Sequence, residues 1–179
     1  KLPEERQTSA NTLEVDTLAV LSDLNHASQK GLQTIFDCSV GRSTVNHPLG
    51  GRYQLTPTEA SVQKLPVQHG VTHTASVMAQ GFNPYVAEWS PYHGAAYAVI
   101  EATARLVAAG ANWSKARFSY QEYFERMDKQ AERFGQPVAA LLGSIEAQIQ
   151  LGLPSIGGKD SMSGTFEELT VPPTLVAFG

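Results

Sequence analysis

The chain has 179 residues, of which 42% are hydrophobic, and its formal net charge is −4 at pH 7. This length fits one domain with a buried core. The mild acidity, without any clustered basic stretch, argues against a nucleic-acid-binding surface, and no apolar run reaches the roughly 18 residues of a membrane helix. The one cysteine, Cys38, excludes an internal disulfide and fits a reducing compartment, so we expect a cytoplasmic protein.

The first part of the chain is predicted to hold a flexible segment and then a helix. Residues 1–15 are polar and are predicted to form a flexible lead-in, and residues 16–179 are predicted to form one domain. Asp16 is a candidate N-cap for a helix over residues 18–30, which Gly31 would end.

Short runs of strand-forming residues follow. They cover residues 34–40, 58–67 and 73–82. The stretch 41–57 between the first two runs is rich in Gly, Pro, Ser and Thr and predicts a long loop, which in compact domains is often functional.

The second half of the chain contains the clearest helices. Ser90 as N-cap and Pro91 in the first turn predict a helix that ends at Gly110. A second helical region is predicted over residues 120–151, broken near 135–137 and stopped by Gly152. Its later part places five large apolar residues on one face: Val138, Leu141, Leu142, Ile145 and Ile149.

The last predicted elements are a short strand at residues 153–156 and a final strand over 170–179. Because the chain ends within an apolar run, we expect it to be excised from something longer. Strands and helices mix without a repeated unit, so the predicted fold class is α/β (α+β), with a small mixed sheet covered by helices.

The stretch GGKDS, from Gly157 to Ser161, is the most suggestive short motif. It does not match a P-loop, because Leu153 stands where the first glycine is needed and Asp160 follows the lysine. Two glycines, Lys159 and the Ser161 hydroxyl still suit an anion, and Asp160 suits a magnesium ion bridging to it. The plainer interpretation, a tight turn after a strand, remains open.

Other polar residues give weaker signals. Glu101 is expected to pair with Arg105 one helical turn later, and Glu59 reads as an exposed strand carboxylate, although either could bind a hard cation. Cys38 lies in an apolar run and is interpreted as structural. His69 and His73 are the one histidine pair with H-x-x-x-H spacing, but they are expected in a turn and at the start of a strand, which argues against a zinc site. The pattern therefore assigns no catalytic residue.

Longer stretches are more specific, and they resemble the phosphoribosylformylglycinamidine synthases of de novo purine synthesis in their long, single-chain form. The resemblance runs through most of the chain from Asp16 onward, and four stretches carry it: residues 36–67, 81–113, 118–126 and 152–169. It implies an ATP-dependent ligase that uses glutamine as amido donor to convert formylglycinamide ribonucleotide to the amidine, with ADP, phosphate and glutamate as the other products.

The resemblance also implies an architecture. Such enzymes contain two copies of the aminoimidazole ribonucleotide synthase fold followed by a glutaminase domain, and this chain is similar to the N-terminal domain of the second copy. These domains pair sheet to sheet into a β-barrel. The implied partners are therefore the first synthase-like half and the glutaminase domain of the same full-length chain. The isolated chain is expected to be inactive and to pair with itself as a homodimer.

Site residues carry over from the resemblance in part. Gly157, Gly158, Lys159, Asp160 and Ser161 match the family's G-K-D-S motif, which implies contact with nucleotide or substrate. Glu59 and Glu101 fall at magnesium ligand positions of an auxiliary ADP site, but Arg105 stands where family members have an asparagine ligand. ATP or ADP and Mg²⁺ are thus the implied cofactors of the full enzyme.

Two rival interpretations stay open. The domain is a non-catalytic scaffold and dimerisation domain if Arg105 has replaced the metal and left a degenerate nucleotide site. In the second interpretation the domain belongs to another enzyme of the superfamily, such as a selenophosphate synthase or a thiamine-phosphate kinase. The long matching stretches argue against this interpretation.

Overall fold

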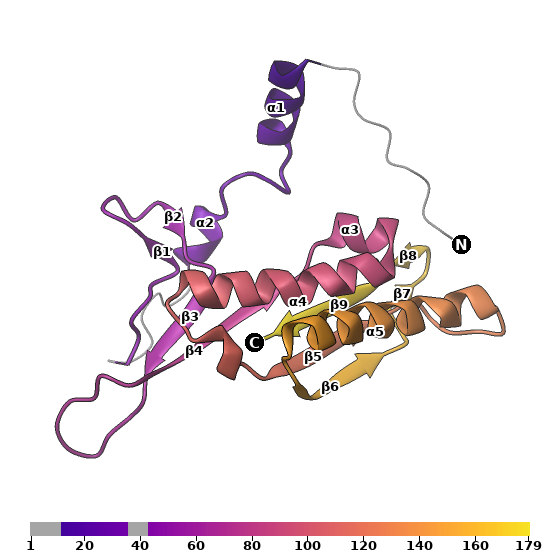
Figure 1. The fold of residues 1–179 in the computed structure, drawn as a ribbon. Coiled ribbons are helices and arrows are strands. Elements are labelled where there is room, and N and C mark those ends of the chain that lie inside the picture. Colours follow the sequence, from indigo (N-terminus) through magenta and orange to yellow (C-terminus); the bar gives the residue numbers. More distant parts are fainter. Residues whose placement is uncertain (1–11, 36–42) are drawn as a thin grey trace.

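A five-stranded mixed sheet forms the centre of the molecule (Figure 1). The computed structural model describes residues 12–35 and 43–179. The strand order is β3-β4-β9-β5-β6, in which only β5 and β6 run parallel. The strands are β3 (Ala60–Lys64), β4 (Ala75–Gly81), β9 (Thr174–Phe178), β5 (Phe118–Tyr123) and β6 (Ser155–Ser161). The mixed α/β class predicted from the sequence is confirmed, and a barrel with a second copy remains a prediction.

One face of the sheet is covered by helices (Figure 1). They are α3 (Pro84–Trp89), α4 (Pro91–Ala108) and α5 (Ala131–Leu151). The helix at Pro91 begins as predicted, because the Ser90 hydroxyl accepts a hydrogen bond from the His93 N–H and proline occupies the first turn. Parallel strands need a crossover connection, and α5 supplies it between β5 and β6.

Smaller elements surround this layer. Two short helices, α1 (Leu13–Ser22) and α2 (Lys30–Gln33), precede the sheet, and a 3₁₀ turn, η1 (Trp113–Lys115), precedes β5. Two small hairpins complete the chain: β1 (Leu49–Gly50) with β2 (Thr56–Pro57), and β7 (Thr165–Phe166) with β8 (Leu169–Thr170). None of the helices among residues 12–35 and 43–179 is long and apolar enough to cross a membrane.

The core lies between the sheet and the inner faces of α4 and α5, and it is made largely of small residues. Its α4 members are Ala95, Ala98, Val99 and Ala102, and they pack against Phe118, Tyr120, Leu175 and Ala177 of the sheet. Small side chains let backbones approach closely. At Gly81 on β4 a Cβ atom would collide with the Ala98 carbonyl of α4, so only glycine fits there.

The helix predicted over residues 18–30 is wrong in its bounds. The helix is α1, which begins at Leu13 with Thr12 as its N-cap, and Asp16 lies in its first turn. Gly31 lies inside α2 rather than ending a helix. No residue of α1 is buried, so packing does not fix where this helix ends. Residues 36–40 of the strand predicted at 34–40, Cys38 among them, lie outside the described residues.

The long helical region predicted over residues 120–151 is wrong at its start and at its break. Residues 118–123 form β5, whose alternating burial is the period of a strand. The helix α5 then runs unbroken from Ala131 through Pro137 to Leu151. Pro137 lies in the second turn and is buried, so the helix forgoes one backbone hydrogen bond while keeping a packing contact. Gly152 ends it in a left-handed conformation, as predicted.

Candidate functional site

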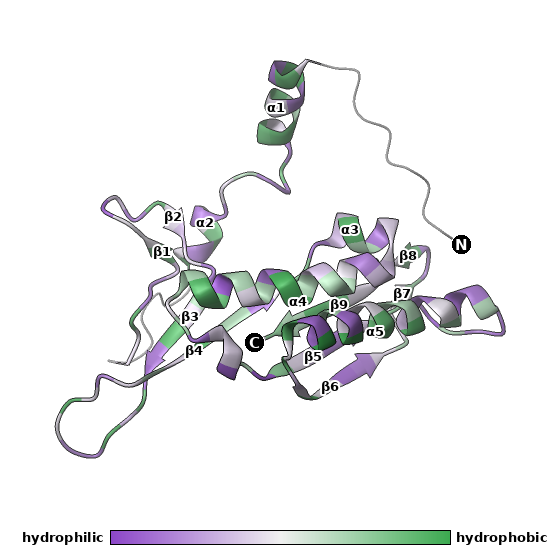
Figure 2. Ribbon diagram, in the orientation of Figure 1, coloured by the Kyte–Doolittle hydropathy of each residue, from purple (hydrophilic) through white to green (hydrophobic). Residues whose placement is uncertain are grey.

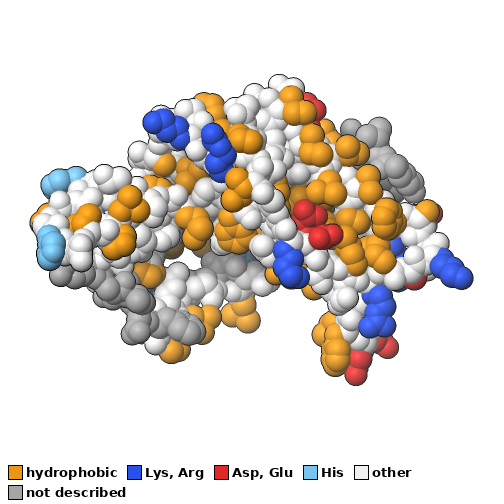
Figure 3. Space-filling model, turned by 90° about the horizontal axis from the view of Figure 1, so that it is seen from below, with side chains coloured by type: hydrophobic (Ala, Val, Ile, Leu, Met, Phe, Trp, Pro, Cys, Tyr) orange, Lys and Arg blue, Asp and Glu red, His pale blue; other side chains and the backbone are white. Residues whose placement is uncertain are grey.

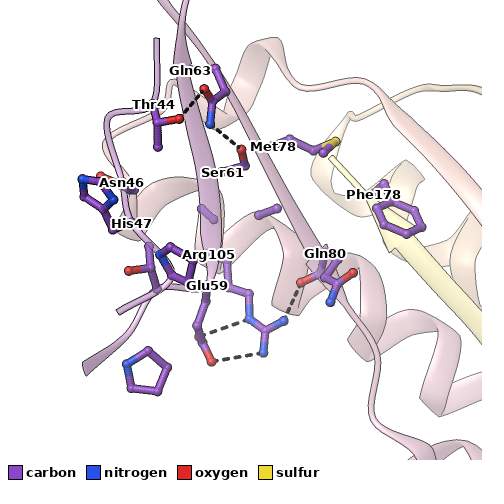
Figure 4. Close-up of a pocket in the computed structure, with 15 residues that line it drawn as sticks. Thr44, Asn46, His47, Glu59, Ser61, Gln63, Met78, Gln80, Arg105 and Phe178 are labelled. Atoms are coloured by element: carbon purple, nitrogen blue, oxygen red, sulfur yellow. Dashed lines mark hydrogen bonds and ion pairs between the residues drawn. The ribbon is translucent and has the colours of Figure 1, made fainter. Parts of the chain in front are cut away.

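An open hollow of about 700 Å³ lies where β3 and β4 meet the C-terminal half of α4 (Figure 4). One wall combines hydrogen-bonding groups: Thr44 and Ser61 lie beside Gln63, whose Oε1 accepts from Thr44 and whose Nε2 donates to Ser61. Met78 and Phe178 supply apolar surface on the opposite side. Part of the predicted loop at 41–57 lines this hollow, so that loop does border a candidate site.

Arg105 is the centre of a charged cluster at the edge of the hollow. Its Nε donates to Glu59 Oε2 at 3.2 Å and its Nη2 donates to Glu59 Oε1 at 3.3 Å. The same Nη2 lies 2.9 Å from Glu101 Oε1. Nη1 donates to the Gln80 carbonyl oxygen at 2.7 Å. The predicted Glu101–Arg105 pair is confirmed, and Glu59 joins it from a distant part of the chain.

Three elements position this cluster. Glu101 and Arg105 lie one turn apart on α4, and Glu59 immediately precedes β3. The Phe82 N–H, just beyond β4, donates to Glu101 Oε2 at 2.8 Å. Because Gly81 lets β4 touch α4, the carbonyl of Gln80 and the N–H of Phe82 both reach side chains of that helix.

The cluster is largely self-contained. A guanidinium has five N–H donors, and the contacts of Arg105 with Glu59, Glu101 and Gln80 engage four of them. Two carboxylates and one guanidinium leave a local charge of −1, which disfavours a bare phosphate. The guanidinium fills the space between Glu59 and Glu101, where a divalent cation would have to lie. These residues therefore do not fit a magnesium ion while Arg105 stays in place.

The loop predicted at Gly157 to Ser161 is wrong, because these residues belong to strand β6. They pair in parallel with β5, which supplies hydrogen bonds that a turn would otherwise take from its own side chains. Successive residues of a strand point to opposite faces, so Lys159 shares a face with Gln121 and Asp160 shares the other with Glu122. One phosphate cannot lie against both side chains.

The structure separates the two predicted site regions. Glu59 and Glu101 lie near β3 and β4, whereas β6 forms the opposite edge of the sheet. At roughly 4.8 Å per strand, the two edges are about 19 Å apart. The end of β6 is strongly hydrophilic (Figure 2). The assignment of Gly157–Ser161 to nucleotide or phosphate binding stays a prediction.

Glu122 is a candidate residue that the sequence reasoning missed. It lies on the helix-facing side of β5 and is only 7% exposed. Burial, together with the charge of Asp160 on the adjacent strand, raises the pKa of Glu122 to about 7. The signal was present in the alternation of FSYQEY, which puts Glu122 on the same face as Phe118 and Tyr120.

The hydroxyl of Tyr120 is buried near Glu122 and has no hydrogen-bond partner in the part of the chain that the structure describes. Burial, and then the charge of Glu122, raise the pKa of Tyr120 above its usual value. Tyr120 thus stays protonated at neutral pH, and its ring stacks on Phe118. Among residues 12–35 and 43–179, neither Glu122 nor Asp160 forms an ion pair with an arginine, in contrast to Glu59 and Glu101.

Comparison with solved structures identifies proteins with the same fold. PurLQS from Thermotoga maritima has a TM-score of 0.67 and 19% identity over 85% of this chain. Phosphoribosylformylglycinamidine synthase II from the same organism has a TM-score of 0.57 and 18% identity over 68% of this chain. Thermotoga maritima PurL complexed with ADP has a TM-score of 0.66 and 18% identity over 88% of this chain.

These similarities concern part of much larger proteins. The chain spans 23%, 19% and 24% of the three matched chains, respectively. No protein-family model matches the sequence, and no curated protein matches it. At identities below one fifth, the similarity establishes that this chain adopts the fold of a portion of those enzymes.

Proposed function

We propose that this chain is a domain of a phosphoribosylformylglycinamidine synthase. The single observation that carries the proposal is the fold match to PurLQS over 85% of the chain. The parent enzyme converts formylglycinamide ribonucleotide, ATP and glutamine to formylglycinamidine ribonucleotide, ADP, phosphate and glutamate. The domain acts in the cytoplasm as part of one longer chain that also holds a first synthase-like half and a glutaminase domain.

The proposal assigns the open face of the sheet to a sister domain. This face carries Met78 and Tyr123, both exposed, and Phe178, which is partly exposed. A sheet from the first synthase-like half pairs with it, which removes these side chains from water. The 179-residue chain by itself is expected to be inactive, because the proposal assigns the glutaminase nucleophile and the other half of the synthase site to other parts of the longer chain.

The test of this proposal is an activity assay of the longer protein. ADP and glutamate should form only when formylglycinamide ribonucleotide, ATP and glutamine are all present, and the 179-residue chain alone should form neither. A longer protein that hydrolyses ATP equally well without formylglycinamide ribonucleotide would contradict the proposal. Activity of the 179-residue chain alone would contradict the proposal that the reaction needs the other domains of the longer protein.

The Arg105 cluster supports a second candidate function, that of a non-catalytic scaffold. In this alternative the guanidinium permanently replaces a metal ion, and the auxiliary nucleotide site is degenerate. The support is that Arg105 engages both carboxylates and the Gln80 carbonyl, so that neither Glu59 nor Glu101 is left for a cation.

Calorimetric titration with ADP and ATP, with and without Mg²⁺, separates the two candidates. The scaffold predicts no magnesium-dependent binding by the natural chain, and binding by Arg105→Asn, which frees both carboxylates. A working auxiliary site predicts magnesium-dependent binding by the natural chain. Lys159→Ala is a useful companion, because Lys159 lies at the far edge of the sheet and should leave any binding at the hollow unchanged.

A further inference from the structure

Helix α5 has two apolar faces, and only one of them meets the body of the protein. The inner face consists of small residues: Pro137, Ala140, Gly143, Ser144 and Ala147 are all buried. A Cβ atom at Gly143 would collide with the Tyr92 carbonyl of α4, so this face packs as closely as two helices can. The large apolar residues of α5 are therefore left on another face.

The second face is a continuous stripe of large apolar side chains. It comprises Phe134, Val138, Leu141, Leu142, Ile145 and Ile149, hereafter the α5 stripe, each between 42% and 69% exposed. The sequence correctly grouped five of these residues on one face, but that face points outward. The charged residues of α5, Glu132, Arg133 and Glu146, lie off the stripe. Figure 3 shows hydrophobic side chains gathered over the half of the molecule that holds α5 and β6.

We propose that the α5 stripe is a dimerisation surface, and that its occupant is the α5 stripe of a second copy of this chain, packed antiparallel. Such an interface is isologous, so a two-fold axis would cross the middle of each stripe. Each side chain must then find a suitable partner at the mirrored position of the same helix.

The spacing of the stripe meets this requirement along its whole length. The midpoint of the stripe in the sequence lies between Leu141 and Leu142. Val138 and Ile145 lie at equal distances on either side of this midpoint, and so do Phe134 and Ile149. In an antiparallel pair Leu141 of one chain therefore opposes Leu142 of the other. Every apolar side chain of the stripe faces another over about 22 Å of helix, at about 1.5 Å per residue.

The size of the stripe sets the expected strength. Six half-exposed aliphatic and aromatic side chains remove roughly 300 Å² of apolar surface per chain, or about 600 Å² in total, which is below standard specific interfaces and fits a weak, reversible dimer. An apolar patch of about this size is often functional in a monomeric protein. A dissociation constant in the micromolar range is therefore expected.

The α5 stripe is a stronger candidate for self-association than the open sheet face. On that face polar residues interrupt the apolar ones: Gln63 and Gln80 flank Met78, and Gln121 lies beside Tyr123. The stripe has no polar interruption, and no described segment of the chain covers it. The two surfaces are separate, because the open sheet face and the helix layer lie on opposite sides of the sheet (Figure 1).

Sedimentation of the 179-residue chain between about 1 and 100 µM tests the proposal. The natural chain should be a dimer at the upper concentration, and Ile145→Glu should weaken dimerisation about 100-fold or more, because it buries two carboxylates near the two-fold axis. Ile100→Glu on α4 is the matched control, since Ile100 is 47% exposed and Ile145 is 46% exposed. Far-UV circular dichroism verifies that both variants are folded.

Two further variants fix the location of the interface. Met78→Glu on the open sheet face should leave the dimer intact. With Cys38 replaced by serine, the pair Val138→Cys and Ile145→Cys should give a disulfide-linked dimer on oxidation, whereas the two positions are too far apart for a bond within one helix. A monomer at 100 µM, or a dimer that survives Ile145→Glu but not Met78→Glu, overturns the proposal.

Discussion

Two of the carboxylate pairs on this fold have opposite surroundings. Glu59 and Glu101 share the guanidinium of Arg105, which also binds the carbonyl of Gln80. Glu122 and Asp160 sit side by side on neighbouring parallel strands, and the causes of the Glu122 pKa shift include no positive charge. The first pair shares one positive charge supplied by the chain itself, whereas the second relies on a proton.

The difference shows how a fold can treat paired acids in two ways. A resident arginine fixes three chain segments at once and leaves little for a ligand to add. An unneutralised buried acid instead costs stability whenever it ionises. The first arrangement is suited to holding structure, and the second leaves a group whose charge depends on pH.

The largest expected effect comes from removing the neutralising cation. Arg105→Ala should lower the free energy of unfolding by about 2.5 kcal/mol at pH 7.5, because it removes four charge-assisted contacts that join three segments of the chain. Urea denaturation measures this change. Arg133→Ala is the matched control, since Arg133 also contacts two carboxylates, Glu125 and Asp128, but joins neighbouring segments only. Its cost should stay below about 1 kcal/mol, and equal costs for both variants would refute the distinction.

The next effect concerns pH. The pKa of Glu122 is about 7 in the folded chain against an ordinary value of 4.5, so the folded state holds the proton more tightly. The contribution is favourable below about pH 4.5 and is lost as pH rises toward 7. Glu122→Gln should therefore be about 2 kcal/mol more stable than the natural chain at pH 8, with little difference at pH 4.5. Denaturation at each pH measures the two free energies of unfolding. A difference between the two proteins that stays constant from pH 4.5 to pH 8 would disprove the raised pKa of Glu122.

The smallest effect separates the two causes of that shift. Burial is the larger cause and the charge of Asp160 the smaller one. Asp160→Asn should thus lower the pKa of Glu122 only part of the way toward 4.5 and should stabilise the chain at pH 8 by about 0.5 kcal/mol. Carboxyl resonances followed by NMR titration report this pKa directly. A fall all the way to the ordinary value would make charge, rather than burial, the dominant cause.

Local signals in the sequence predicted some elements and could not predict others. Ser90 and Pro91 define the start of α4 by hydrogen bonding within a few residues, so they were readable in advance. Residues 157–161 form a strand only because β5 lies beside them, and the chain between the two strands is a whole helix. Pro137 breaks a helix by local rules, yet burial against the body keeps α5 continuous.

The candidate site divides in the same way. The Glu101–Arg105 contact follows from one helical turn and was predictable. Glu59 arrives from 46 positions away in the chain, and only the resemblance to a known family suggested that it belongs with Glu101. The burial of Glu122 can be predicted only if residues 118–123 are recognised as a strand. The sequence interpretation placed a helix from residue 120 onward and therefore missed it.

Gly81 sets how closely β4 approaches α4 beside the Arg105 cluster. Its neighbours Gln80 and Phe82 offer the carbonyl and the N–H that Arg105 and Glu101 bind, and a single methyl group at Gly81 would strike the Ala98 carbonyl. The distance between β4 and α4 at the hollow therefore depends on the absence of a Cβ atom at Gly81. Substitutions of side chains around the hollow leave this distance unchanged. A Cβ atom at Gly81 would instead push β4 and α4 apart and move the groups that Arg105 and Glu101 bind.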